Sequence, residues 1–140
     1  MKHALTILLL GAAAAAPERD VLDLVNGHRR AAGLGELAWH EAAAAEARTH
    51  CGRLLAGQAA GPHDGFAARA ERLRRAAGAR QAGENVFLME NGRFRAERAL
   101  EAWLASEGHR RTMEGPFDLT GVGVVTRGSR ACAAQIFLGR

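Results

Sequence analysis

The chain has 140 residues and a net charge of +4, and its only lysine is Lys2, so the other basic residues are all arginines. This length suits one domain with a modest core. The densest basic run has Phe66 as its only nearby aromatic residue and comprises Arg69, Arg72, Arg74, Arg75 and Arg80. Nucleic-acid sites join basic patches to stacking aromatic rings, so we exclude that function class and interpret the run as a solvated helix face.

The first sixteen residues have the pattern of a secretory signal peptide. Lys2 and His3 form a short basic start, Ala4–Leu10 is apolar, and Ala12–Ala16 offers small residues for cleavage. We therefore expect a secreted or periplasmic protein whose mature domain spans residues 17–140. The apolar stretch is short for a membrane span, so a retained membrane anchor is the less favoured alternative, and no later segment is a candidate transmembrane helix.

The chain contains two cysteines, Cys51 and Cys132. In an oxidising compartment an even pair is consistent with one disulfide. Two separate buried thiols that act as small apolar residues are equally consistent with the sequence. The choice between them depends on the geometry of the fold.

Helical patterns dominate the first half of the mature chain. The spacing of apolar residues predicts a helix that begins at Pro17 and ends before Gly33, then helices at about 41–55 and 66–77. Leu37 and Trp39 are interpreted as apolar residues that lead into the second helix. Its alanine-rich face favours close packing against a neighbouring element.

Extended patterns become prominent after Gly78. Residues 81–88 are predicted to be extended, residues 94–105 form a fourth helix that stops at Gly108, and residues 121–126 and 131–138 form a β-hairpin. Helices precede the hairpin, so the sequence predicts an α+β domain in which helices pack on an antiparallel sheet.

Two polar residues in the middle of the chain are candidates for a site. His63 lies in a loop rich in glycine and proline, where a histidine is either a solvated surface residue or a functional group held on a rigid scaffold. Glu84 lies between Gly83 and Asn85 at the start of an apolar run, where a buried carboxylate would need partners. Its alternative role is to satisfy backbone groups of a loop together with Asn85.

His109 and Glu107 follow the fourth predicted helix. His109 is either a site residue or a cation that interacts favourably with the helix C-terminus. Glu107 is either a further polar ligand or a solvated side chain. The spacings of these residues match no local metal motif such as His-Glu-x-x-His, so each signal is weak by itself.

Taken in order, the motifs resemble those of the CAP (SCP-like extracellular) superfamily, above all its small bacterial members. The resemblance extends from about Val21 to Phe137. It rests on these segments: Asn26-x-x-Arg29, Gly33-Leu34, Leu37-x-Trp39, the His63 loop, Gly83-Glu84-Asn85-Val86, Trp103-x-x-Ser106-x-Gly108-His109-Arg110, Gly121-Val122-Gly123-Val124 and Gln135-Ile136-Phe137.

The resemblance implies a three-layer α-β-α sandwich with a central antiparallel sheet. It also implies a cavity lined by two histidines and two acids, which in some members holds a divalent metal such as zinc. His63 and Glu84 correspond to the first histidine and the first acid, and His109 to the second histidine. In the animal and plant members the second acid stands at the position that Ser106 occupies here. Glu107 is the next residue, so the cavity has three such polar residues unless Glu107 takes the place of the second acid.

These features indicate a ligand-binding or interaction module more than an enzyme, and they assign no catalytic residue. The expected partner is a small ligand, such as a lipid or sterol, or a component of the cell envelope. The first alternative is a zinc-dependent hydrolase in which His63 and His109 hold the metal and Glu84 is a ligand or general base. The second is a structural envelope protein whose polar residues serve folding.

Overall fold

The computed structural model describes residues 15–140, so the predicted signal peptide lies, apart from its last two residues, outside the described part. The elements are α1 (Ala16–Ala31), β1 (Ala38–Trp39), α2 (Glu41–Leu55), α3 (Phe66–Ala77), β2 (Gln81–Met89), α4 (Ala96–Ala105), α5 (Glu107–Met113), β3 (Leu119–Arg127) and β4 (Arg130–Gly139). No helix within residues 15–140 is both long enough and apolar enough to cross a membrane.

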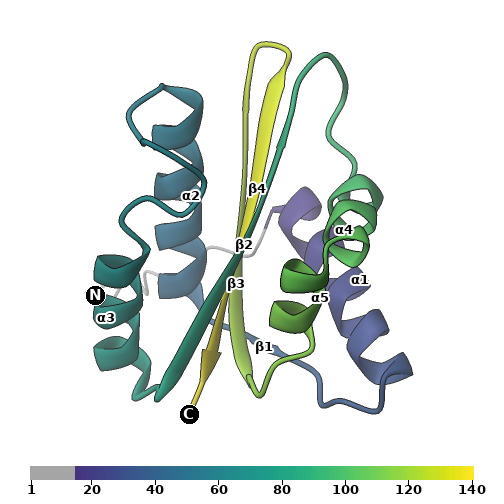
Figure 1. The fold of residues 1–140 in the computed structure, drawn as a ribbon, viewed down its shortest axis with the longest axis vertical. Helices are drawn as coiled ribbons and strands as arrows, with labels where there is room; N and C mark the ends of the chain where they lie inside the picture. Colours follow the sequence, from purple (N-terminus) through teal and green to yellow (C-terminus); the bar gives the residue numbers. More distant parts are fainter. Residues whose placement is uncertain (1–14) are drawn as a thin grey trace, which may run out of the picture.

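The four strands form one sheet in the order β1-β3-β4-β2, and helices cover both of its faces (Figure 1). Helices α2 and α3 lie on one face, and α1, α4 and α5 lie on the other. The β3–β4 and β2–β4 pairs are antiparallel, whereas the two-residue strand β1 pairs with β3 in parallel. The predicted three-layer α-β-α sandwich is therefore confirmed.

Each sheet face has its own apolar core. Because side chains alternate along a strand, neighbouring residues of β4 contribute to opposite cores. Ile136 packs with α2 and α3, and Phe137 packs with Trp103 of α4 and Met113 of α5. Strand β4 thus holds the two helical layers together through its central residues.

Helix α2 packs unusually close to β3, as its alanine-rich face predicts. A Cβ atom at Gly121 would lie 2.0 Å from the backbone nitrogen of Ala44, and one at Gly123 would lie 2.3 Å from that of Arg48. Both positions therefore require glycine. The Gly121-x-Gly123 motif is explained by this contact between a helix and a strand.

Cys51 of α2 and Cys132 of β4 form a disulfide that joins the helical layer to the sheet. Of the two alternatives that the sequence allows, the structure thus contains the disulfide, and no cysteine is free. Cross-links that close a long loop typically add about 2–4 kcal/mol to the free energy of unfolding.

The motif Asn26-x-x-Arg29 ties two loops to α1. The Asn26 side chain pairs with the backbone N–H and C=O of Leu37. The buried Arg29 guanidinium donates to the carbonyl oxygens of Gly35, Met113, Gly115 and Phe117. Burial lowers the pKa of Arg29. This motif therefore serves the fold.

Three of the expected local structures were wrong. Helix α4 begins at Ala96 instead of residue 94, and after a break at Ser106 a separate helix, α5, begins at Glu107. His109 therefore lies inside α5 and is not a cation at the end of α4. Trp39 belongs to β1, where its backbone pairs with β3, because the sheet offers an edge that the sequence does not reveal.

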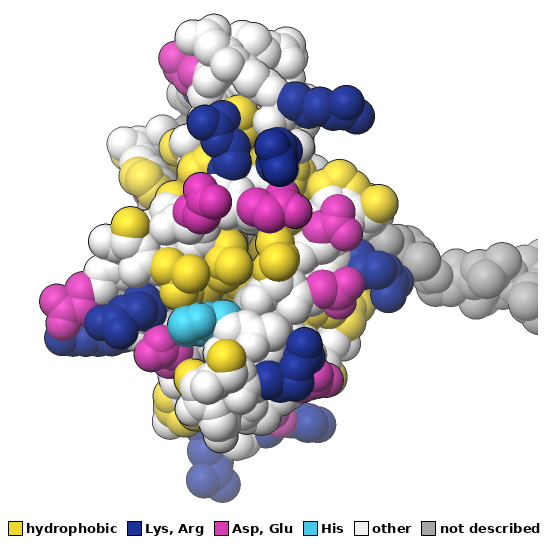
Figure 2. Space-filling model, turned by 90° about the vertical axis from the view of Figure 1, so that its right-hand side faces the viewer, with side chains coloured by type: hydrophobic (Ala, Val, Ile, Leu, Met, Phe, Trp, Pro, Cys, Tyr) yellow, Lys and Arg dark blue, Asp and Glu magenta, His cyan; other side chains and the backbone are white. Residues whose placement is uncertain are grey.

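The outer face of the α1, α4 and α5 layer carries charges of both signs. Figure 2 shows arginine and acidic side chains around a small central group of apolar side chains. Nearly all large apolar residues within 15–140 are at least partly buried, and Leu88 is the exception.

Candidate functional site around Glu84

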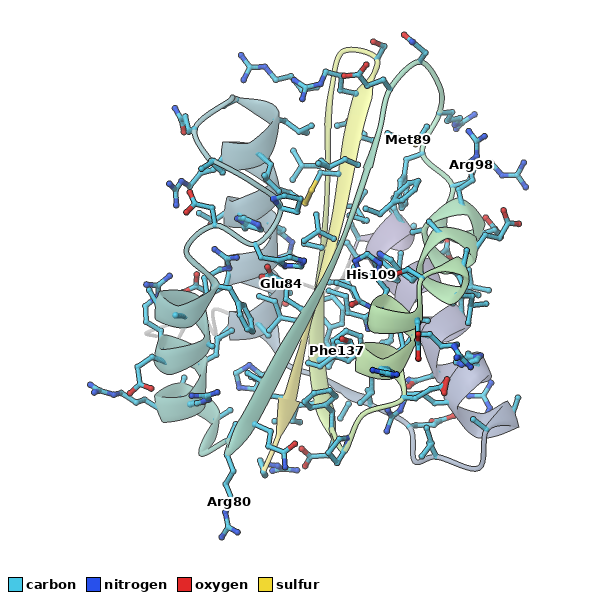
Figure 3. The ribbon with its side chains drawn as sticks, viewed as in Figure 1. Arg80, Glu84, Met89, Arg98, His109 and Phe137 are labelled. Atoms are coloured by element: carbon cyan, nitrogen blue, oxygen red, sulfur yellow. A yellow bond between two sulfur atoms is a disulfide. The ribbon has the colours of Figure 1, made fainter. Side chains whose placement is uncertain are left out.

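The candidate site lies along β2, which is an edge strand of the sheet. Successive residues of a strand point to opposite faces. Glu84 accordingly contacts the α2 and α3 layer, while Asn85 donates from Nδ2 to the backbone oxygen of His109 in α5, at 2.9 Å. Figure 3 shows Glu84 and His109 on opposite sides of this strand. The Gly83-Glu84-Asn85 motif therefore connects both helical layers at one edge.

Glu84 is a buried carboxylate whose partners are all charged or titratable. Arg69 of α3 donates from Nε and Nη2 to the two carboxylate oxygens, at 3.0 and 2.9 Å. Nδ1 of His63 lies 3.1 Å from Oε1. The Glu84 side chain is only 1% exposed. Paired, charge-assisted bonds of this kind offset the cost of burying the carboxylate.

His63 lies just before α3 and has 49% of its side chain exposed. Because carboxylate oxygens only accept, the neutral His63 ring donates its Nδ1–H to Glu84 and keeps a lone pair on Nε2. Arg69 also donates from Nη1 to the backbone oxygen of Asp64, at 2.8 Å. The same arginine thus holds both the carboxylate and the loop that carries the histidine.

His109 lies across β2 from Glu84, in α5, whose first turn is capped by Ser106. The Ser106 hydroxyl accepts from the backbone N–H of His109 at 3.4 Å, which accounts for the Ser106-x-x-His109 spacing. Burial lowers the pKa of His109, and the nearby charge of His63 lowers it further. The sign of this second contribution is the one expected for a like charge near the His109 ring.

Glu107 lies apart from these three side chains. Its carboxylate is exposed and pairs with Arg111 one turn along α5. Since Ser106 caps this helix, neither of the two residues considered for the second acid contacts Glu84 or His63. In the structure His63 and Glu84 are in direct contact, and His109 lies on the other side of the edge strand β2.

Sequence reasoning missed two residues that contact Glu84. Arg69 was assigned to a solvated helix face, but it is 3% exposed, because α3 turns that side toward the sheet. His50 of α2 is 1% exposed, and its Nε2 lies 3.9 Å from Glu84. The signal was available in α3: Arg69 falls between Phe66 and Leu73 on the apolar stripe of the helix.

The described side chains do not form a complete metal site of the kind seen in zinc enzymes. Within residues 15–140 no group of three or more histidine, cysteine, aspartate or glutamate side chains could hold one ion. Catalytic zinc takes three protein ligands, and structural zinc usually takes four. Glu84 is occupied by Arg69, so His63 Nε2 and the His109 ring remain as potential ligands, with Glu84 behind His63 as an orienting carboxylate.

Comparisons with solved structures find the same fold in bacterial proteins. An extracellular protein with an SCP domain from Bacillus anthracis str. Ames is 27% identical, with a TM-score of 0.72 over 89% of this chain and 40% of its own. A cysteine-rich secretory protein from Staphylococcus aureus subsp. aureus Mu50 is 18% identical, with a TM-score of 0.69 over 89% of this chain and 39% of its own.

An outer surface protein from Borrelia burgdorferi is similar along most of its length. It is 14% identical, with a TM-score of 0.74 over 87% of this chain and 91% of its own. The similarity to the proteins from S. aureus and B. burgdorferi concerns the fold alone. The chain spans about two fifths of the proteins from B. anthracis and S. aureus.

Comparison with curated protein sequences gives no match. The model of the cysteine-rich secretory protein family, CAP, matches residues 22–137. This range includes both helical layers apart from the first residues of α1, the sheet apart from the last residues of β4, and all four candidate site residues. With the α-β-α fold and the ordered motifs, the match establishes that this chain belongs to the CAP family.

Proposed function

We propose that the chain is a secreted binding module whose ligand contacts the ring nitrogens of His63 and His109 at the β2 edge. The observation that carries this proposal is the set of contacts made by the two ring nitrogens of His63. Its Nδ1 is engaged by buried Glu84, and its half-exposed ring leaves Nε2 for a ligand. Secretion is supported by the extracellular and outer surface proteins that share the fold.

The contacts of Glu84 favour binding over hydrolysis. A hydrolase would use this carboxylate as a metal ligand or as the base that activates water. Here both oxygens already accept from Arg69, one also contacts His63, and the side chain is sealed from solvent. Glu84 is therefore suited to orienting His63 and poorly placed to take a proton from bulk water.

A divalent metal fits this site only with donors beyond those that residues 15–140 offer. His63 Nε2 and a ring nitrogen of His109 would be its two protein ligands, and water or atoms of the ligand would complete the coordination. A metal held in this way would supply a positive centre that attracts an anionic or carbonyl oxygen. Glu84 would keep His63 oriented, as carboxylates commonly do behind a ligating histidine.

Calorimetric titration of the purified protein with Zn²⁺ tests this proposal. The wild type should bind one ion, and His63→Ala/His109→Ala should abolish binding. His28→Ala is the matched control, because His28 pairs with Glu114 and has no contact with Glu84. It should bind Zn²⁺ as the wild type does.

Absence of Zn²⁺ binding by folded wild type would reject the metal-assisted form of the proposal. Binding without metal would then be tested by adding lipid vesicles or sterol and following the His63 and His109 ring signals by NMR. Ring signals that shift for no ligand of either kind would contradict the binding site itself.

A further inference from the structure

The outer side of β2 is an open edge of the sheet, and Figure 1 shows this strand in front of the others. Its pairing with β4 runs from Gln81 to Met89 without a bulge. Proteins commonly protect an exposed edge with proline, lysine or a bulge. The segment Gln81–Met89 has none of these, and its one charged residue, Glu84, is turned inward to Arg69. The edge is therefore free to pair with another strand.

The hydrogen-bond pattern of the sheet shows which residues of β2 face outward. The carbonyl oxygen of Thr120 accepts from the β1 side of the sheet, so its neighbour Gly121 faces β4. Gly121 lies opposite Ile136, so the preceding residue of β4, Gln135, faces β2. Asn85 lies opposite Gln135 and faces β4 in turn. The residues on either side of Asn85 therefore direct their backbone groups away from the sheet.

The outward backbone groups of β2 are those of Ala82, Glu84, Val86 and Leu88. At Glu84 the whole residue is 7% exposed, whereas its side chain is 1% exposed, so the exposed surface belongs mainly to the backbone. Asn85, whose backbone groups face β4, is 0% exposed. Within residues 15–140 no backbone hydrogen bond from outside the strands reaches these four residues. They form a row of donors and acceptors that a further strand could use.

The two ends of β2 are complementary to each other. Arg80 precedes the strand, and Figure 3 shows its side chain pointing away from the domain. Glu90 follows the strand, is 70% exposed and lies 3.5 Å from Arg130. Leu88, with 45% of its surface exposed, lies near the acidic end, and the small Ala82 lies on the same sheet face near the basic end. The best match for this edge is an antiparallel strand with the same features, which is β2 itself.

We propose that two copies of this chain associate through their β2 strands, which pair antiparallel about a two-fold axis beside Asn85. In this register the following residues of the two copies lie opposite each other: Glu84 and Val86, Ala82 and Leu88, and Arg80 and Glu90. Each contact occurs twice, as a two-fold interface requires. Leu88 covers Ala82 of the second copy, Arg80 gains a carboxylate partner, and the two sheets become continuous.

The axis lies beside the candidate site. Glu84 contacts His63, and Asn85 contacts the backbone oxygen of His109. The candidate sites of the two copies therefore lie next to each other in the dimer. The interface itself consists of residues 80–90 and needs neither a metal nor a ligand.

Sedimentation equilibrium of the purified, oxidised protein in the presence of EDTA tests the proposal. Wild type should dimerise, and Arg80→Glu should raise the dimer dissociation constant about tenfold, because like charges then face each other at both ends of the interface. Glu90→Arg should have the same effect, and the charge swap Arg80→Glu/Glu90→Arg should restore dimerisation. Arg75→Glu is the matched control, since this exposed residue of α3 pairs with Glu71, and it should dimerise as the wild type does.

Hydrogen exchange measured by NMR locates the interface. The amides of Glu84 and Val86 should exchange more slowly as the protein concentration rises, whereas that of Asn85, which faces β4, should be protected at every concentration. The His63→Ala/His109→Ala protein should still dimerise, so failure of the zinc proposal and failure of this one are distinguishable. A wild type that is monomeric up to about 1 mM, a charge swap that does not restore dimerisation, or edge amides that ignore concentration would overturn the proposal.

Discussion

Two buried glutamates, Glu18 and Glu84, have nearly the same ion pair but different third partners. Arg48 donates to Glu18 through Nε and Nη2 at 2.8 and 2.7 Å, as Arg69 does to Glu84 at 3.0 and 2.9 Å. The other partners of Glu18 are backbone N–H groups, above all that of Val124 at 3.1 Å, with that of Ala15 at 3.3 Å. The third partner of Glu84 is the half-exposed ring of His63.

The third partner separates a structural carboxylate from a candidate site. Val124 lies on β3 past the end of the short strand β1, so no strand pairs with it on that side. Without Glu18 its backbone N–H would be an unpaired donor at the edge of the sheet. Glu18 therefore completes the sheet. Glu84 instead orients a titratable ring that reaches solvent. Burial and pairing with arginine are common to both, so neither feature identifies a functional carboxylate.

Removal of each carboxylate should show the largest difference between the two pairs. Glu84→Ala leaves Arg69 buried without a counter-ion, and loss of one partner of a buried pair costs about 3–5 kcal/mol of unfolding free energy. Glu18→Ala should cost less, about 1–3 kcal/mol, because Arg48 is one-third exposed and keeps Glu41 as a partner. Urea unfolding of the oxidised proteins measures both values, and equal losses would contradict the comparison.

Replacing the whole Glu84 pair should separate stability from binding. In Arg69→Met/Glu84→Leu no charge is left unpaired, so most of the stability lost in Glu84→Ala should return. His63 loses its orienting carboxylate, so Zn²⁺ affinity should still fall about 10–100-fold. Urea unfolding and zinc calorimetry on the same preparation check this. A double variant with wild-type zinc affinity would show that Glu84 does not orient His63.

The interaction between the His63 and His109 rings should change the pKa of His109. Its pKa lies below the ordinary value because of burial and the charge of His63, so His63→Ala should raise it. A lowered pKa means that the folded protein binds the proton less readily than the unfolded chain. This contribution to stability is present above the unfolded pKa of about 6.5 and is lost as the pH falls toward the folded pKa.

NMR titration of the His109 ring in wild type and in His63→Ala measures this shift directly. The His28→Ala protein serves as the reference, since His28 is not among the causes that lower the pKa of His109. An identical pKa of His109 in all three proteins would mean that the two rings do not interact.

The smallest effect is expected at Glu107. Its carboxylate and Arg111 are both exposed neighbours on α5, and such surface pairs contribute roughly 0–1 kcal/mol. Glu107→Ala should therefore unfold at nearly the wild-type urea concentration and bind Zn²⁺ with unchanged affinity. A marked loss of zinc binding in the calorimeter would place Glu107 at the site after all.

The local sequence predicted most elements well and failed where partners are distant. The bounds of α2 and α3 match the predicted ones because periodic apolar residues and glycine stops are local signals. Helix α5 was missed because Gly108 was interpreted as a stop, whereas Ser106 caps a new helix. Strand β1 was missed because two residues become a strand only when β3 lies beside them.

For the site, the sequence by itself determined the types of the reactive groups and their order along the chain. His63, Glu84 and His109 could be named as candidates because loop position, motif and residue chemistry are properties of the sequence. Their contacts were decided by the tertiary structure alone. Arg69 binds Glu84 only because α3 packs its apolar stripe on the sheet, and Asn85 reaches the backbone oxygen of His109 only because it points to the opposite face of β2. Such contacts join residues far apart in the chain, so no local pattern encodes them.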